Sequence, residues 1–425
     1  MPARSDSAAG RVAFTHPGFV LFQTARFLLV CALEMQAVAV GWQVYEITKR
    51  PLDLGLVGLA QFLPGILLFP ISGHTSDRFE RRHVISACYA GLALCFATLL
   101  GLSLRGVHSV APIYVVLVML GVFRTFNSTA SRSILPLLVP EQHFPNAVAW
   151  NATTFQTATI LGPSLGGILY AATHGPSTVY ATATVTAAVA LISTFRIRPE
   201  GQARPREPMT MKTVFAGLRF IWQQKLILGA ISLDLFAVLL GGSVALLPVY
   251  AREILRTGPW GLGLLRSAPG VGAAVMAVAL AHRPLRGKSG TTLLWAVAGF
   301  GICTIIFGLS RSLTVSLIAL FLLGASDMIS VIIRATLTQL ATPDEMRGRV
   351  TAVDMIFIGA SNEFGQFESG VTAQWFGTVP AVVLGGVGTL VVITLWAWMF
   401  PELRHAGELT SIKSRKLDDA SSAAG

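Results

Sequence analysis

The hydrophobic residues of this 425-residue chain gather in long runs that short polar segments separate. Two of these runs, Leu54–Ser72 and Val84–Leu104, flank the polar segment Gly73–Arg82. Each run approaches the ~20 residues that an α-helix needs to cross a ~30 Å hydrocarbon layer. The intervening segment carries five formal charges in six residues, a load that a lipid-facing backbone does not bear. It is therefore predicted to be a tight, solvated hairpin between two membrane helices.

The same pattern repeats along the chain and predicts an all-α membrane protein of about twelve transmembrane helices. The first six runs cover about Phe19–Tyr45, Leu54–Ser72, Val84–Leu104, Ile113–Leu138, Ala147–Ala171 and Pro176–Phe195. The last six cover about Leu226–Tyr250, Gly261–Ala281, Thr291–Leu309, Leu313–Leu340, Val350–Phe376 and Ala381–Phe400.

Composition agrees with a membrane protein, because 53% of the residues are hydrophobic and only 12% are charged, against about 25% charged in soluble chains. The net charge of +11 lies mainly in short loops, as the positive-inside rule requires, and does not indicate a nucleic-acid partner. All four cysteines fall inside apolar runs without metal-site spacing, so neither a metal nor a cofactor is expected. We see no cleaved signal peptide at the N-terminus.

The charge distribution also predicts a division into parts. Residues 1–196 form a first six-helix half, 197–225 a basic cytoplasmic linker, 226–401 a second half and 402–425 a disordered cytoplasmic tail. Within the linker, Met211–Trp222 is predicted to be an amphipathic helix on the membrane surface. Both termini are expected in the cytoplasm of a bacterial inner membrane, with Lys49 and Arg50 outside.

The two halves resemble each other. Gly162–Gly167 aligns with Gly365–Gly370 at an offset of 203 residues (365 − 162), and Pro140 pairs with Pro343 at the same offset. Such an internal repeat is typical of transporters built from two related halves.

The segment Gly73–Arg82 resembles the loop between helices 2 and 3 of the major facilitator superfamily, whose pattern is Gly-x-x-x-Asp-Arg-x-Gly-Arg-Arg. The matching residues are Gly73, Asp77, Arg78, Arg81 and Arg82, while Glu80 replaces the second glycine. The resemblance implies that Asp77 is a cytoplasmic gate residue that contacts the N-terminus of helix 11, where exposed N–H groups favour an anion. The alternative is a solvated turn that only sets topology.

A second motif, formed by Gly162, Pro163, Gly166 and Gly167, resembles the signature of proton-driven exporters in this superfamily. Small residues there let two helices approach closely, so ordinary helix packing is the alternative interpretation. Leu233–Phe236, Ala245–Tyr250 and Ala341–Arg349 further resemble the branch that contains bacterial enterobactin exporters. That branch implies proton-coupled export, with a siderophore as one candidate substrate.

Ionisable residues inside apolar runs are functional suspects because they are expensive to bury in a membrane. The cavity-lining candidates are Glu34, Arg124, Asp234, Asp327 and Arg334. Arg124 opens a segment that resembles the family's helix 4 motif Arg-x-x-Gln-Gly with two substitutions. Glu34 and Asp327, near the middle of their runs, are the leading pair for proton handling. For Arg132, Arg266, Arg334 and Asp354, snorkelling to a membrane interface remains an alternative.

Asp327 and Arg334 are seven residues apart and so share a helix face, too far for a direct bond but close enough to line one cavity. The resulting hypothesis is a monomeric, proton-coupled exporter of a small molecule that works by alternating access. An importer or uncoupled facilitator on the same fold is the alternative. A membrane enzyme is disfavoured, since the sequence carries neither a His-Glu-x-x-His nor a Cys-x-x-Cys motif.

Overall fold

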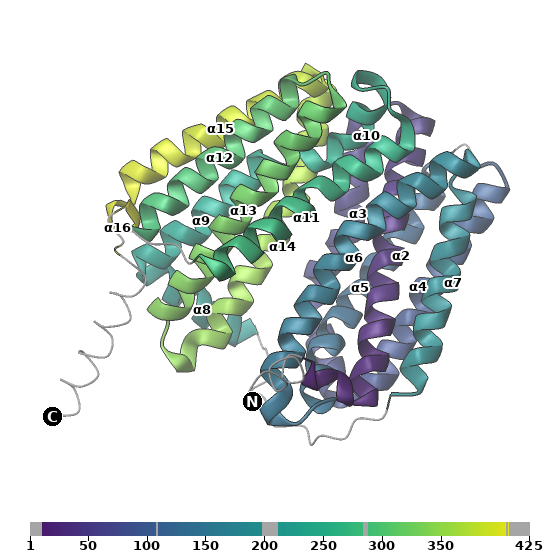
Figure 1. Ribbon diagram of the computed structural model, residues 1–425, viewed down its shortest axis with the longest axis horizontal. Coiled ribbons are helices and arrows are strands. Elements are labelled where there is room, and N and C mark those ends of the chain that lie inside the picture. Colours follow the sequence, from purple (N-terminus) through teal and green to yellow (C-terminus); the bar gives the residue numbers. More distant parts are fainter. Residues whose placement is uncertain (1–10, 108, 198–210, 284–287, 405–406, 408–425) are drawn as a thin grey trace, which may run out of the picture. The chain divides into compact units, whose positions relative to one another are not determined.

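The protein is described by a computed structural model that covers residues 11–107, 109–197, 211–283, 288–404 and 407, and only the backbone at 69, 70, 76, 77, 211 and 212. Residues 198–210 of the predicted linker and 408–425 of the predicted tail lie outside this description. The described chain is built from helices (Figure 1). They are α2 (Pro17–Thr48), α3 (Pro51–Arg78), α4 (Arg81–Leu104), α5 (Ala111–Ile134), α6 (Phe144–Thr173), α7 (Ser177–Phe195), α8 (Met211–Gln223), α9 (Lys225–Leu240), α10 (Leu247–Val249), α11 (Gly258–His282), α12 (Ser289–Leu309), α13 (Leu313–Ala341), α14 (Asp344–Phe376), α15 (Thr378–Met399) and α16 (Pro401–Arg404).

Ten spans within the described residues are long and apolar enough to cross a membrane. One of them, Lys225–Ile254, joins α9, α10 and the short helices around α10. Two further helices are long but more polar, namely α6 with 30 residues and α14 with 33. With these two, the described part of the chain is consistent with the predicted twelve membrane helices. The fold is that of an all-α, multi-pass membrane protein.

The chain separates into two compact units, and the first comprises residues 1–49, 59–209 and 257–267. In this unit α2 packs against α6 and α7, and α4 packs against α5 and α7 (Figure 1). Large side chains fill the interior between these helices, including the fully buried Phe22, Tyr89, Phe96 and Tyr180. The unit therefore has an apolar core of its own, and the first turns of α11 belong to it.

The second unit comprises residues 50–58, 210–256 and 268–425. Here α12 packs against α13 and α15, while α14 packs against α8, α9 and α15. One core cluster joins α9, α12, α13 and α15 through residues such as Leu233, Val297, Ile333 and Trp396. The first turns of α3, residues 50–58, belong to this unit.

Equivalent glycines in the two units make equivalent contacts. A Cβ on Gly162 of α6 would come within 2.6 Å of Glu34 on α2, and one on Gly365 of α14 within 2.9 Å of the Leu239 oxygen on α9. Three Å is already closer than real Cβ contacts, so both glycines are required by backbone approach. Gly167 likewise meets Gly263 at the start of α11, and Gly370 meets Gly55 at the start of α3. The offset of 203 residues read from the sequence thus holds for helix packing as well.

Two local predictions need correction. The segment Gly73–Arg82 is a tight hairpin as predicted, but most of it is helical, because α3 continues past Ser72 through Arg78 and only Phe79 and Glu80 separate it from α4. The Phe79 N–H bonds the Thr75 oxygen at 3.0 Å, which completes the last turn of α3. The predicted run Leu226–Tyr250 is not one continuous helix either, since α9 ends at Leu240 before the pair Gly241–Gly242.

The break after α9 has a steric cause. A Cβ on Gly242 would lie 2.6 Å from the backbone carbonyl of Gly365, so the chain here runs directly against the backbone of α14. The helix α8 occupies the position of the predicted amphipathic helix. Its apolar residues, such as Val214, Leu218 and Ile221, pack with Val350 and Val353 at the start of α14.

Candidate functional site

In the second unit, one arginine joins two carboxylates from different helices. Arg334 on α13 lies 3.2 Å from Asp234 on α9 and 2.7 Å from Asp354 on α14. Arg334 is only 4% exposed and Asp234 only 8%. The Arg334 guanidinium is therefore buried among helices and does not snorkel, while Asp354, for which snorkelling was the alternative, is its ion-pair partner. A buried guanidinium is stabilised when carboxylates neutralise it and accept its N–H groups, as they do here.

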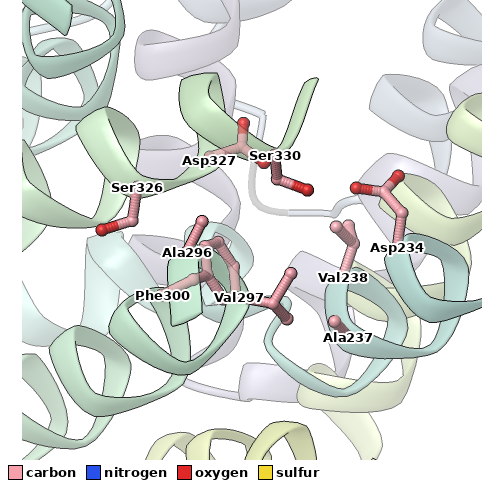
Figure 2. Close-up of a pocket in the computed structure, with 9 residues that line it drawn as sticks. All are labelled: Asp234, Ala237, Val238, Ala296, Val297, Phe300, Ser326, Asp327 and Ser330. Atoms are coloured by element: carbon pink, nitrogen blue, oxygen red, sulfur yellow. The ribbon is translucent and has the colours of Figure 1, made fainter. Parts of the chain in front are cut away.

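A small pocket lies beside this ion-pair network (Figure 2). Its empty volume is about 220 Å³, part of it open to solvent. The lining comes from α9, α12 and α13, and consists of Asp234, Ala237, Val238, Ala296, Val297, Phe300, Ser326, Asp327 and Ser330. Figure 2 shows Ser330 and Asp234 pointing toward one another, with Asp327 one turn before Ser330 on α13. The pocket is thus apolar on the α12 side and polar on the α13 side.

Asp327 differs from the two paired carboxylates. It makes no ion pair with any described residue, although Asp234 and Arg334 are both within electrostatic range of it. The group therefore contains three carboxylates, Asp234, Asp327 and Asp354, but a single guanidinium. As expected from the sequence, Asp327 and Arg334 share one region of α13 without bonding each other.

In the first unit, Glu34 lies where α2 meets α6. The Cβ of Glu34 fills the space that a side chain at Gly162 would need, and Gly166 faces Met35 one turn further along the same seam. A third helix reaches this point, because Arg266 of α11 places its Nε 3.9 Å from the Glu34 carboxylate. Glu34 thus pairs with Arg266, not with Arg124 or Arg334.

The start of α11 is also held to α6 by polar contacts. The Ser267 hydroxyl donates to the Ile160 carbonyl at 2.6 Å, and the Ser164 and Ser267 hydroxyls are 2.9 Å apart. Gly263 packs against the backbone of Pro163 and Gly167. The motif Gly162–Gly167 therefore combines close helix packing with a carboxylate–arginine pair. Gly162 and Gly166 face α2, whereas Ser164 and Gly167 face α11.

The remaining predicted residues have other surroundings. Arg124 on α5 donates to the Gln61 side chain of α3 at 3.1 Å. Arg82 donates to the Ile197 carbonyl at 3.2 Å and so satisfies an oxygen just beyond α7. A Cβ on Gly73 would meet nothing within 4 Å. Asp77 lies in the last turns of α3, with its side chain outside the description.

The structure brings Asp234, Asp327 and Arg334 together, while Glu34 and Arg124 belong to the other unit. It adds two partners, Asp354 and Arg266, for which the sequence left snorkelling to a membrane interface as an alternative. Both stood among the ionisable residues inside apolar runs, which was the only available signal. Among the described residues, no group of three or more His, Cys, Asp or Glu side chains is arranged to hold a metal.

Helices of membrane-spanning length, the internal repeat and the buried ion pairs define a membrane transporter with the major facilitator fold. Solved transporters share this fold. A bacterial homologue of the human lysosomal transporter Spinster superposes with a TM-score of 0.70 at 14% identity, over 92% of this chain and 97% of its own. The D-xylose–proton symporter gives a TM-score of 0.68 at 15% identity, over 90% and 97%. At such identities the likeness shows the fold alone.

The chain belongs to the transmembrane secretion effector family, which matches residues 12–422. Among named relatives, the enterobactin exporter EntS of Escherichia coli K12 is 26% identical over 398 residues, or 92% of this chain and 94% of the relative. EntS of Citrobacter koseri is 28% identical over 398 residues, with the same coverage. This similarity extends over nearly the full length of both proteins.

Proposed function

We propose that this protein exports a small molecule, a siderophore or a drug-like compound, by proton antiport with alternating access. The plan behind the proposal is two six-helix halves joined by a cytoplasmic linker, in a monomer that spans the bacterial inner membrane with both termini inside. The observation that carries it is the group Asp234, Asp327, Asp354 and Arg334, in which two carboxylates contact one guanidinium and a third, Asp327, lines the adjoining pocket.

The charge balance of this group favours a bound proton. With Arg334 shared between Asp234 and Asp354, the ionised group carries one positive and three negative charges, hence a net charge of −2. Burial disfavours the charged form of a carboxyl group, and like charges nearby disfavour it further. Asp234 and Asp354 are paired with Arg334, so we assign proton uptake to Asp327, the carboxylate without an ion pair among the described residues.

Release of that proton requires a change in its surroundings. Arg334 is held by two carboxylates from two helices, α9 and α14, so a relative movement of these helices alters which carboxylate it neutralises. When Arg334 is freed toward Asp327, the cation stabilises the Asp327 carboxylate and the proton leaves. Alternating access supplies such a movement, with the proton taken from outside and delivered inside.

Glu34 offers a second proton-sensitive contact, in the first unit. Its carboxylate pairs with Arg266 at 3.9 Å next to the motif glycine Gly162. Protonation of Glu34 removes the ion pair and frees Arg266 for an anionic substrate. Relatives named as enterobactin exporters support an exported substrate of this kind. Asp77 is kept in the proposal as a cytoplasmic gate residue, together with Gly73, Arg78 and Arg81.

The experiment is uphill export in proteoliposomes with an imposed pH gradient. The transported compound is first found by a siderophore and drug susceptibility panel on a deletion strain. Glu34→Gln and Asp327→Asn mimic the protonated side chains, and Glu402→Gln, on the exposed helix α16, is the matched control. We expect at least one of the first two variants to abolish uphill export while downhill exchange continues.

Two outcomes contradict the proposal in different ways. If both variants export uphill at the wild-type rate, Glu34 and Asp327 are structural, and coupling must be sought at Asp234 or on α14. If the wild-type protein moves substrate at a rate that the pH gradient does not change, the protein is an uncoupled facilitator. Uphill movement in the opposite direction would make it an importer.

A further inference from the structure

Arg26 on α2 is a cation inside a membrane helix without a carboxylate partner among the described residues. It lies nine residues after Pro17, or about 14 Å along the helix at 1.5 Å per residue. Its guanidinium stacks over the ring of Phe155 on α6, with 5.6 Å between the guanidinium carbon and the ring centroid. A half-buried cation that stacks on an aromatic ring, with no carboxylate beside it among the described residues, is a poor structural element and a good ligand site.

The surroundings of Arg26 contain hydrogen-bonding groups. The phenol of Tyr89 on α4 is within electrostatic range of it. One turn before Arg26, Gln23 is 4% exposed, and its amide nitrogen and oxygen both lack a partner among the described residues. One turn before Tyr89, Ser86 is also 4% exposed, with its hydroxyl likewise unbonded in the described structure.

A guanidinium group inside a membrane helix is unfavourable unless an anion lies near it. The unbonded Arg26 Nε and Gln23 Nε2 atoms are donors, which an anion can satisfy. We propose that Arg26, with Gln23 one turn before it and Tyr89 nearby, forms an anion-binding subsite that holds a carboxylate or phosphate group. This inference rests on the proposed transport function and adds to it the charge of the substrate.

The position of the subsite relates it to the proton-sensitive contact. Arg26 faces Phe155 on the same α2–α6 seam on which Cys31 faces Ala158 and Glu34 faces Gly162. Arg26 and Glu34 are eight residues apart, which is about 12 Å along the helix axis. Phe155 is 45% exposed, so an aromatic ring can approach its free surface while the N–H edge of Arg26 binds a carboxylate. An aromatic carboxylate therefore fits the subsite best.

The test uses 4-fluorobenzoate and its uncharged counterpart 4-fluorobenzamide as probes of the purified protein in phosphatidylcholine nanodiscs. Binding is measured by fluorine NMR line broadening, without any proton gradient. We expect 4-fluorobenzoate to bind the wild-type protein and 4-fluorobenzamide not to. Arg26→Gln should weaken benzoate binding by about tenfold or more, and Arg26→Lys by less, because lysine keeps the charge but not the planar fork.

The matched control is Arg105→Gln, at the exposed C-terminal end of α4, which should bind benzoate as the wild type does. Arg26→Gln should also unfold at the same temperature as the wild type or higher, because it removes an uncompensated charge. If Arg26→Gln does not insert into the membrane, Arg26→Lys carries the comparison. The inference is overturned if Arg26→Gln binds 4-fluorobenzoate as tightly as the wild-type protein does. It is also overturned if the wild-type protein binds 4-fluorobenzoate and 4-fluorobenzamide equally.

A second arm distinguishes the two sources of the anion. The benzoate measurement is repeated in nanodiscs that contain the anionic lipid phosphatidylglycerol. If the lipid weakens benzoate binding, the subsite is assigned to a lipid phosphate. If benzoate binding is unchanged, the subsite is assigned to a soluble carboxylate. Because these measurements need no transport, they are independent of proton coupling. If the protein binds benzoate but shows no gradient-driven export, the anion-binding subsite is supported and the proton antiport mechanism is contradicted.

Discussion

Replacing Gly166 with alanine tests whether the motif on α6 serves close helix packing. A Cβ at this position would lie 2.8 Å from the Met35 Cα and 3.0 Å from its oxygen, both of them backbone atoms of α2. Such atoms cannot rotate away, so α2 and α6 must separate. Overpacking of this kind costs about 1–3 kcal/mol. The alanine also gains about 1 kcal/mol of helix propensity, which partly hides the cost.

Gly101→Ala removes that ambiguity as a matched control. Gly101 is also helical, on α4, but a Cβ there would meet nothing within 4 Å. The propensity gain is common to both variants, so the difference between them isolates the contact with Met35. We expect Gly166→Ala to be less stable than Gly101→Ala by about 1–3 kcal/mol.

The assay is unfolding of the bicelle-embedded protein by sodium dodecyl sulfate, followed by tryptophan fluorescence to obtain the free energy of unfolding. Equal free energies for the two variants would refute the packing argument. A stable Gly166→Ala protein that no longer transports would instead assign the glycine a purely functional role.

Two further predictions concern topology and the gate. Reporter fusions after Thr48 and within residues 203–208 should report opposite sides of the membrane, because span length and loop charge place the first outside and the second inside; the same side at both would contradict the topology. Asp77→Asn should insert normally but transport far more slowly, because it removes the charge expected to bind a helix N-terminus. Export at the wild-type rate by that variant would leave Asp77 only a role in topology.

Most of the fold follows from the sequence because a bilayer leaves few choices. The length of the apolar runs predicts the long helices. The runs Ala147–Ala171 and Val350–Phe376 predict α6 and α14 in this way, although both helices contain polar residues. The interruption after Leu240 was missed, although Gly241–Gly242 stood in the sequence. A glycine pair inside an apolar run predicts a break or a close approach, and the structure shows both here, because α9 ends at Leu240 and Gly242 lies against the backbone of α14.

The candidate site was predictable in its members but not in its pairings. Asp234, Asp327 and Arg334 stood out because charges are rare inside membrane helices. The partners Asp354 and Arg266 lie near predicted helix ends, where snorkelling explains a charge equally well. Choosing between snorkelling and an ion pair requires knowing which helices pack together. Arg334, for example, pairs with residues 100 positions before it and 20 positions after it (334 − 234 and 354 − 334).

The grouping of the first turns of α3 with the second unit, and of α11 with the first, affects how the protein is made. The first unit includes residues 257–267, so it cannot complete its contacts when residue 196 leaves the ribosome. The glycines of α6 that contact α11 meet their partners only after about sixty further residues beyond residue 196 have been synthesised (257 − 196 = 61), and residues 50–58 meet α14 later still. The first unit is therefore completed only after part of the second half of the chain has been synthesised.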